Sequence, residues 1–329
     1  MRKISLIASL ATFTALSPLA AQETEKAEYP SPNAIVDAAP ASEWVKIAPS
    51  DLLVMDLAPD AEGNARRVVI QLMPPPFSQG WIRNIRKLAA VQWWDGTSVN
   101  RVQDNYVVQW GDAGYDNPES GETEQKALPE GLETVPESEY LSKLTGIDGE
   151  KSNAHNSDLT TGTTEVYRGD PYGSALFGLG WPLGSGNQSL WPVHCYGAVG
   201  VGRNYSPDTG SGAELYTVIG HAPRHLDRNI AVVGRVIEGI EHLSSLPRGK
   251  GQLGFYEDAG KRVPISSIRL ASELPATKQL HFEYLDTEGK AFAKYADARA
   301  NRRDPFFIVP AGGADICNIP VPVRRVSGE

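Results

Sequence analysis

Short apolar runs, rich in valine and isoleucine and bounded by turn residues, recur through much of this chain. The runs LLVMD (52–56) and RVVIQL (67–72) are separated by the turn cluster DAEGN (60–64), which is typical of a β-hairpin. Seven or eight such runs stand beside two helical patterns, which predicts a mainly β fold: an antiparallel barrel with helices over its open ends. The other runs lie at 97–99, 106–110, 191–203, 212–223, 228–236 and 263–271.

An amphipathic pattern after the proline triplet 74–76 predicts the longer helix. Proline cannot continue the interior of a strand, and Ser78 is a candidate N-cap. Apolar side chains then recur at helical spacing until Asp95–Gly96, and a shorter helix is predicted over 239–247. The apolar positions are Trp81, Ile85, Leu88 and Ala89 in the first helix, and Ile240, Leu243 and Leu246 in the second.

Residues 1–21 have the pattern of a secretory signal peptide. The basic residues Arg2 and Lys3 precede a mostly apolar stretch at 4–16 that is too short to span a bilayer comfortably, and LAA (19–21) resembles a cleavage site. We therefore expect the mature chain to have no membrane span. We also expect it to be exported, to a periplasm or out of the cell.

Turn content and polarity divide the rest of the chain. We interpret residues 22–48 as a leader or linker, 49–271 as the barrel domain, and 113–190 as a long insertion of loops without a core of its own. Residues 272–329 form a C-terminal extension with one predicted helix, KAFAKYADARANRR (290–303). The net charge of −9, without a basic stripe interleaved with aromatic residues, argues against nucleic acid as a partner.

Cys195 and Cys317 are the two cysteines of the chain. An oxidising compartment permits a disulfide between them, and two buried thiols are the alternative. The six histidines form no H-E-x-x-H motif, the glycines of GAVGVG (197–202) are in the wrong order for a dinucleotide loop, and no G-x-S-x-G is present. We therefore expect no metal and no cofactor.

Two separated blocks carry a family pattern. The first is R-V-x-x-x-Y-V-V-Q-x-G-D at 101–112, preceded by the amphipathic helix, and the second is GAELYTVIGHAPRHLDRNIAVVGRVIEGIEHL at 212–243. Together they resemble the core signature of the cyclophilin peptidyl-prolyl isomerases, over roughly 50–112 and 191–271. The resemblance implies a closed eight-stranded antiparallel barrel capped by two helices.

The resemblance also implies roles for particular positions. Arg101 matches the catalytic arginine of the family and Gln109 its substrate-binding glutamine. Glu214 stands at a glutamine position, either lining the groove or forming a salt bridge, and its charge could pair with Arg101. The remaining substrate-binding positions are Tyr106 and Tyr216, which replace phenylalanines, Val107, which replaces a methionine, Leu226, and His225, where many members have tryptophan.

These roles imply a peptidyl-prolyl cis-trans isomerase that assists the folding of exported proteins, with proline-containing polypeptides as clients. A catalytically weak peptide- or protein-binding module is the alternative, because Glu214 adds charge and the insertion at 113–190 is unusually long and could cover the groove. Without the resemblance, Arg101 would be interpreted as a solvated strand residue.

Overall fold

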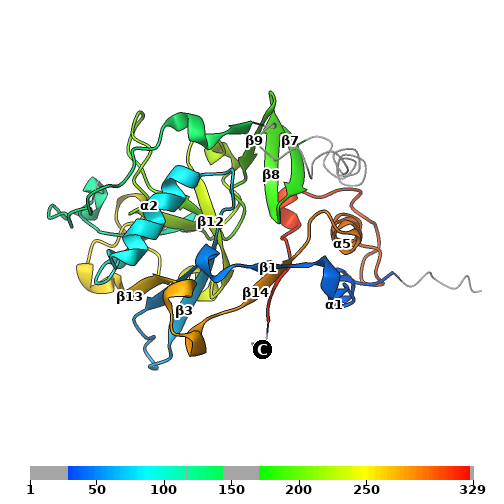
Figure 1. Cartoon of the computed structure of the whole chain (residues 1–329), viewed down its shortest axis with the longest axis horizontal. Helices are drawn as coiled ribbons and strands as arrows, with labels where there is room; N and C mark the ends of the chain where they lie inside the picture. Colours follow the sequence, from blue (N-terminus) through cyan, green and yellow to red (C-terminus); the bar gives the residue numbers. More distant parts are fainter. Residues whose placement is uncertain (1–28, 116, 144–169, 327–329) are drawn as a thin grey trace, which may run out of the picture.

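The barrel strands follow the predicted runs. The computed structural model describes residues 29–115, 117–143 and 170–326, so the predicted signal peptide lies outside the described residues. Among these residues, eight antiparallel strands close into a barrel in the order β10-β11-β5-β4-β13-β2-β3-β12, of which Figure 1 labels β3, β12 and β13. This confirms the predicted mainly β fold. The strands are β2 (Leu52–Leu57), β3 (Arg66–Leu72), β4 (Ser98–Val102), β5 (Val107–Gly111), β10 (Ala198–Val201), β11 (Leu215–Val218), β12 (Val232–Glu238) and β13 (Val263–Leu270).

The β2–β3 hairpin is apolar on both faces because both faces are covered. Alternate side chains of a strand point to opposite sides of the sheet. Leu53, Met55 and Ile70 belong to the main barrel core, whereas Val54 and Val69 pack with Phe282 of the C-terminal extension. The continuous apolar runs in the sequence therefore reflect burial by the extension as well as by the barrel.

Helix α2 (Gln79–Ala90) lies across the barrel, and the short α4 (Glu241–Ser244) follows β12. Their apolar side chains, Leu243 of α4 among them, join the main core. Ser78 holds the N-cap position but does not cap the helix. Its backbone is left-handed, with φ 55°, and its hydroxyl donates to the Val232 carbonyl oxygen at 2.7 Å, so it ties the helix start to β12 instead.

The insertion contributes more regular structure than we expected from its sequence. Strands β6 (Ser142–Lys143), β7 (Ser174–Gly178), β8 (Trp181–Gly186) and β9 (Ser189–Pro192) form a second sheet in the order β6-β9-β8-β7. Its hairpins turn at 179–180 and 187–188, where both central residues have positive φ, as tight hairpin turns require. The many glycine and serine residues of this stretch concealed the strand pattern.

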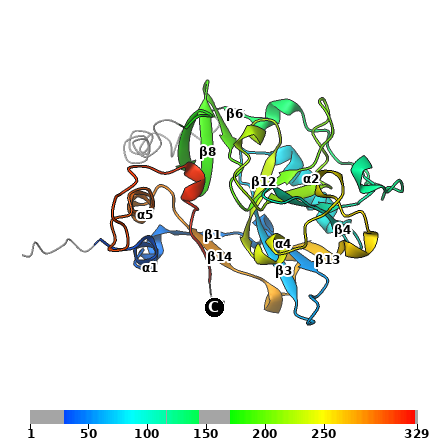
Figure 2. The ribbon, with the colours of Figure 1, turned by 180° about the vertical axis from the view of Figure 1, so that it is seen from behind.

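The leader and the extension form a third sheet with two helices. Strands β1 (Trp44–Ile47), β14 (Phe282–Leu285) and β15 (Val323–Arg325) pair in the order β1-β14-β15. Helix α5 (Lys290–Ala300) forms where a helix was predicted, and both views place it beside α1 (Pro32–Asp37), away from the barrel (Figures 1 and 2). Single-turn 3-10 helices lie at Ala41–Glu43, Pro49–Asp51, Pro118–Ser120, Glu137–Tyr140, Arg224–Leu226, Gln252–Gly254, Ala259–Lys261, Ala271–Glu273, Ala276–Lys278 and Ile316–Asn318.

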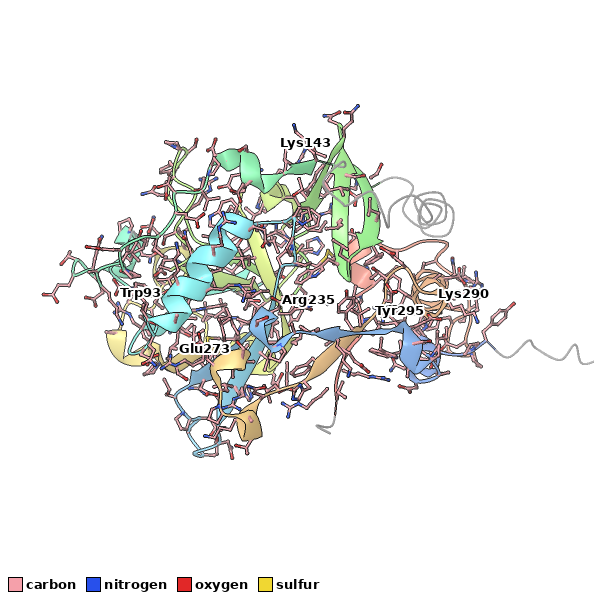
Figure 3. The ribbon with its side chains drawn as sticks, in the orientation of Figure 1. Trp93, Lys143, Arg235, Glu273, Lys290 and Tyr295 are labelled. Carbon is pink, nitrogen blue, oxygen red and sulfur yellow. A yellow bond between two sulfur atoms is a disulfide. The ribbon has the colours of Figure 1, made fainter. Side chains whose placement is uncertain are left out.

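Arg235 of β12, labelled in Figure 3, bonds residues of both the barrel and the second sheet. Its Nε and Nη2 donate to Gln71 Oε1 at 3.0 and 2.8 Å, and its Nη1 donates to the Gly180 carbonyl oxygen at 2.8 Å. The guanidinium also lies 4.4 Å from the ring centre of Trp181. Burial lowers the pKa of Arg235 to about 9, which leaves it protonated at neutral pH.

A disulfide bond links the C-terminal extension to the segment that follows β9. Of the two alternatives for the cysteines, the structure has the disulfide, with the Cα atoms of Cys195 and Cys317 5.1 Å apart. In the same region, Phe177 of the second sheet packs edge-on against Phe292 of α5. No helix among the described residues is long and apolar enough to cross a bilayer.

Replacing both cysteines, in the variant Cys195→Ser/Cys317→Ser, should lower the free energy of unfolding by about 2–4 kcal/mol. The bridge joins residues 122 positions apart, so its loss restores much conformational freedom to the unfolded chain. Urea denaturation followed by tryptophan fluorescence measures this, with reduced wild type as the matched control. An unchanged unfolding midpoint would show that the bridge adds nothing to stability.

Candidate active site

Three of the candidate residues lie in one row across the barrel wall. Arg101 of β4 is the register partner of Gln109 on β5, and Gln109 is in turn the partner of Tyr216 on β11. The row continues to Gly200 on β10 and, on the other side, to Phe255, which forms a bridge with Arg101. Arg101 and Gln109, eight residues apart in the sequence, are therefore brought side by side by the β4–β5 hairpin.

The row faces outward from the barrel. Val108, Trp110 and Leu215 belong to the main core, so the residues alternating with them project from the opposite face of the wall. On that face, Val107, Tyr216 and Val218 form a separate small cluster with Tyr106 and Ile230 beside it. The apolar side chains at this point therefore do not fill the barrel interior.

A cavity of about 470 Å³ lies over the row, and we name it the Arg101 cavity. Its size is within the range of about 300–1,000 Å³ that is usual for small-molecule sites. It brings together all but one of the predicted site residues: Arg101, Tyr106, Val107, Gln109, Glu214, Tyr216 and Leu226. His225 is exposed and is not among the lining residues, because the turn at 224–226 directs Leu226 rather than His225 to the cavity.

Arg101 is held in place on several sides. Its Nε donates to the Leu253 carbonyl oxygen at 2.8 Å, its Nη1 donates to Gln109 Oε1 at 3.0 Å, and its Nη2 donates to Gln103 Oε1. The rings of Tyr106 and Phe255 lie 5.8 and 5.6 Å from the guanidinium carbon. Burial lowers the pKa of Arg101, but an arginine remains protonated in this setting. Arg101 is therefore an ordered cation in the cavity wall and not a solvated strand residue.

Glu214 does not pair directly with Arg101, contrary to the ion pair that the sequence suggested. Its Oε1 accepts the backbone N–H of Asp112 at 2.6 Å, and its Oε2 accepts from Asn117 Nδ2 at 3.3 Å. Gln109 Nε2 donates to Asn117 Oδ1 at 2.9 Å, so the connection from Glu214 to Arg101 runs through two amides. The carboxylate is 4% exposed as a residue, and burial raises its pKa well above the ordinary value.

Gly111 explains the position of Glu214. A Cβ atom on Gly111 would lie 2.0 Å from Glu214 Oε1, and the glycine has a φ of 146°, which side chains rarely adopt. Only glycine therefore leaves room for the carboxylate to lie over the end of β5. This placement turns the acid toward Asp112 and Asn117 rather than toward the guanidinium.

Sequence reasoning missed several residues of the site. Asn117, Tyr115 and Glu119 come from the start of the insertion, and Leu253 and Phe255 come from the loop before β13. These stretches are irregular, and their sequences carry no periodic signal. The described part of the insertion thus lines one side of the Arg101 cavity, and residues 144–169 lie outside the described residues.

The described residues contain no group of three or more histidine, cysteine, aspartate or glutamate side chains placed to hold a metal ion. The described lining of the Arg101 cavity supplies a fixed cation, amide groups and aromatic rings. Such a set can bind an extended peptide and stabilise a partial negative charge.

The fold is that of the cyclophilins. The structure resembles the crystal structure of cyclophilin AquaCyp293 from Hirschia baltica, with a TM-score of 0.58, 20% sequence identity, and coverage of 87% of this chain and 94% of that chain. A cyclophilin type peptidyl-prolyl cis-trans isomerase from Cryptosporidium parvum gives a TM-score of 0.37 at 11% identity, with coverage of 67% of this chain and 96% of that chain.

The family model "Cyclophilin type peptidyl-prolyl cis-trans isomerase/CLD" matches residues 65–270, more than half of the 329-residue chain. The chain therefore belongs to this family and is a peptidyl-prolyl cis-trans isomerase of the cyclophilin type. This confirms the resemblance found in the two sequence blocks. No curated protein sequence matches the chain.

Glu214→Gln should stabilise the protein at about pH 7, with an advantage that shrinks as the pH falls to about 4. The unfolded chain releases the Glu214 proton at the ordinary pKa, whereas burial in the folded chain holds the proton to higher pH. The folded state thus binds more protons between these two values, and wild-type stability falls as the pH rises through that interval.

Thermal unfolding of wild type and Glu214→Gln across this pH range measures the difference. Glu62→Gln, in an exposed turn, is the matched control and should show no such trend. A stabilisation by Glu214→Gln that is larger at about pH 4 than at pH 7 would contradict a raised pKa.

Proposed function

We propose that the Arg101 cavity binds the proline of an X-Pro segment and that Arg101 catalyses rotation about the X-Pro bond in exported proteins. The observation that carries this proposal is the ordered guanidinium in the cavity wall, bonded to Gln109 and flanked by aromatic rings. The cavity beside it is lined by Tyr106, Tyr216 and Leu226 and is large enough for a five-membered ring.

The reaction explains why an arginine is needed. Rotation about a peptide bond must break amide resonance against a barrier of about 18–20 kcal/mol. In the twisted transition state the proline nitrogen becomes pyramidal and regains a lone pair. A fixed N–H donor directed at that nitrogen binds the twisted form better than either planar form, and such differential binding is what lowers the barrier.

The other residues supply what a single donor cannot. A hydrogen bond to a charged group contributes roughly 1.5–3 kcal/mol, or about 10- to 150-fold in rate. Tyr106, Val107 and Tyr216 would hold the proline ring away from water, which strengthens the bond from Arg101. Gln109 would bind the neighbouring backbone while it orients the guanidinium. No metal, cofactor or covalent intermediate is needed for this chemistry.

Two observations support exported clients and a periplasmic or secreted location. Residues 1–21 have the basic start, apolar stretch and small-residue end of a signal peptide. The Cys195–Cys317 disulfide is of a kind that forms in oxidising compartments and is rare in the reducing cytosol. The proposed substrates are therefore X-Pro bonds of polypeptides that fold after export.

Arg101→Ala should lower kcat/KM for a short Ala-Pro peptide by roughly 10- to 150-fold, because it removes the charged donor. A cis-trans isomerisation assay measures this, with Arg83→Ala as control. Arg83 is an arginine of α2 that pairs with Glu133 on the surface and does not line the Arg101 cavity. Equal activity of Arg101→Ala and wild type would contradict the proposed role of Arg101. A wild type that binds the peptide but shows no activity would favour the peptide-binding module.

Export should yield a mature chain that begins near Gln22. Intact-mass spectrometry of the periplasmic fraction of a Gram-negative host measures this after expression of the full chain. A chain without residues 1–21 is the control and should stay in the cytoplasm. Recovery of the uncleaved chain from the cytoplasm alone would count against export.

A further inference from the structure

Tyr216 forms part of the wall of the Arg101 cavity, and backbone lies directly behind its ring. A Cβ atom on Gly200, the register partner of Tyr216, would lie 2.4 Å from the Tyr216 hydroxyl oxygen and from the ring carbon that carries it. The tip of the ring therefore passes over a position that only glycine leaves open. Beyond it, the hydroxyl oxygen lies 3.0 Å from Nε2 of His194, and the two rings are within 10° of parallel.

His194 is itself held in one orientation. Its Nδ1 and its backbone N–H both lie against the same Asp227 carboxylate oxygen, at 2.9 and 3.0 Å. An ionised carboxylate only accepts hydrogen bonds, so Nδ1 carries its hydrogen, and in that tautomer an uncharged imidazole accepts at Nε2. Burial raises the pKa of Tyr216 well above its usual value, which keeps the hydroxyl protonated and able to donate to Nε2 in this tautomer.

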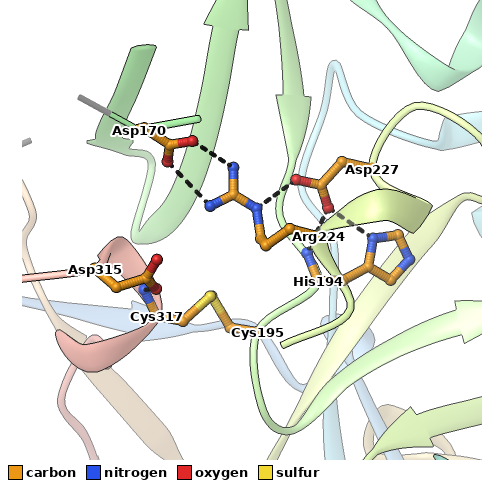
Figure 4. The surroundings of a disulfide bond; sticks show 7 residues. All are labelled: Asp170, His194, Cys195, Arg224, Asp227, Asp315 and Cys317. Carbon is orange, nitrogen blue, oxygen red and sulfur yellow. Dashed lines mark hydrogen bonds and ion pairs between the residues drawn. A yellow bond between two sulfur atoms is a disulfide. The ribbon is translucent and has the colours of Figure 1, made fainter. Parts of the chain in front are cut away.

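The contacts of Asp227 continue through Arg224 to Asp170 of the insertion (Figure 4). The second Asp227 oxygen accepts from Arg224 Nε at 2.6 Å, and Arg224 Nη1 and Nη2 donate to the two Asp170 carboxylate oxygens at 3.0 and 3.4 Å. His194 is 0% exposed, Asp227 2% and Arg224 4%. Buried charges require partners, and each charge in this chain of contacts has one.

We propose that His194 is a positioning residue for the isomerase, because it fixes the Tyr216 ring as a wall of the proline site. The proposal rests on the function proposed for the Arg101 cavity. His194 does not reach the cavity lining, so it acts through the Tyr216 hydroxyl. The Tyr216 network, made up of Tyr216, His194, Asp227, Arg224 and Asp170, then links the geometry of the proline site to the insertion.

Because the Tyr216 hydroxyl is bonded to His194, the position of the Tyr216 ring depends on His194. A phenylalanine in this place would carry no polar group and would need no partner. Without His194, the buried hydroxyl loses its partner, and an unpaired buried group is costly enough that the ring would turn toward water in the cavity. The proline site would then lose its wall. Removing both polar partners together leaves no unpaired hydroxyl.

A double-mutant cycle tests this coupling. We expect His194→Leu to lower kcat/KM for an Ala-Pro peptide about tenfold in the wild-type background, and less than about twofold in the Tyr216→Phe background. His194→Gln, whose side-chain oxygen can accept the hydroxyl, should recover much of the loss. Equal losses in both backgrounds would overturn the proposal, because a merely structural histidine would cost the same with or without the hydroxyl.

Two further measurements keep the proposal falsifiable if His194→Leu folds poorly or if the wild type is inactive. Nitrogen-15 NMR of the wild-type imidazole should show a protonated Nδ1 and an unprotonated Nε2, and the reverse tautomer would overturn the proposal. An inactive wild type would defeat the proposed function. The cycle would then be measured on the Kd of the same peptide, with the same coupling expected and with additive effects overturning it.

Discussion

The site depends on the order of the Arg101 guanidinium, and one of the hydrogen bonds that order it joins two neighbouring strands. Arg101 and Gln109 are register partners on β4 and β5, so backbone pairing places the Gln109 amide oxygen 3.0 Å from Nη1 of the guanidinium. A free arginine side chain has large rotamer freedom, which would be lost again each time a substrate bound. The barrel wall provides this order in advance, and preorganised donors are what electrostatic catalysis requires.

Parts of the chain outside the barrel strands support the same row of residues. Asn117 of the insertion joins Gln109 to Glu214, and Asp170, also of the insertion, pairs with Arg224 behind the row. The C-terminal extension is bonded to Cys195, the residue next to His194. The insertion therefore contacts the row directly through Asn117, and both the insertion and the extension reach residues directly behind it.

Much of the fold could be predicted because local patterns agree with the final structure. The short apolar runs form the barrel strands, and the residues spaced as Trp81, Ile85 and Leu88 form α2. The contacts of Glu214 could not be predicted. They depend on the space over Gly111 and on Asn117, which lies in an irregular segment 97 positions away in the sequence. Likewise, the Ser78 hydroxyl donates to a carbonyl oxygen of β12 that lies 154 positions away in the sequence.

The most direct test of an oriented guanidinium is the activity of Arg101→Lys, measured by exchange NMR on an Ala-Pro peptide beside wild type and Arg101→Ala. Lysine keeps the positive charge but lacks the planar fork that bonds Gln109, Gln103 and the Leu253 carbonyl. If orientation by the barrel wall is what accelerates rotation, Arg101→Lys will be nearly as slow as Arg101→Ala. An Arg101→Lys rate close to wild type would contradict this, because charge alone would then be sufficient.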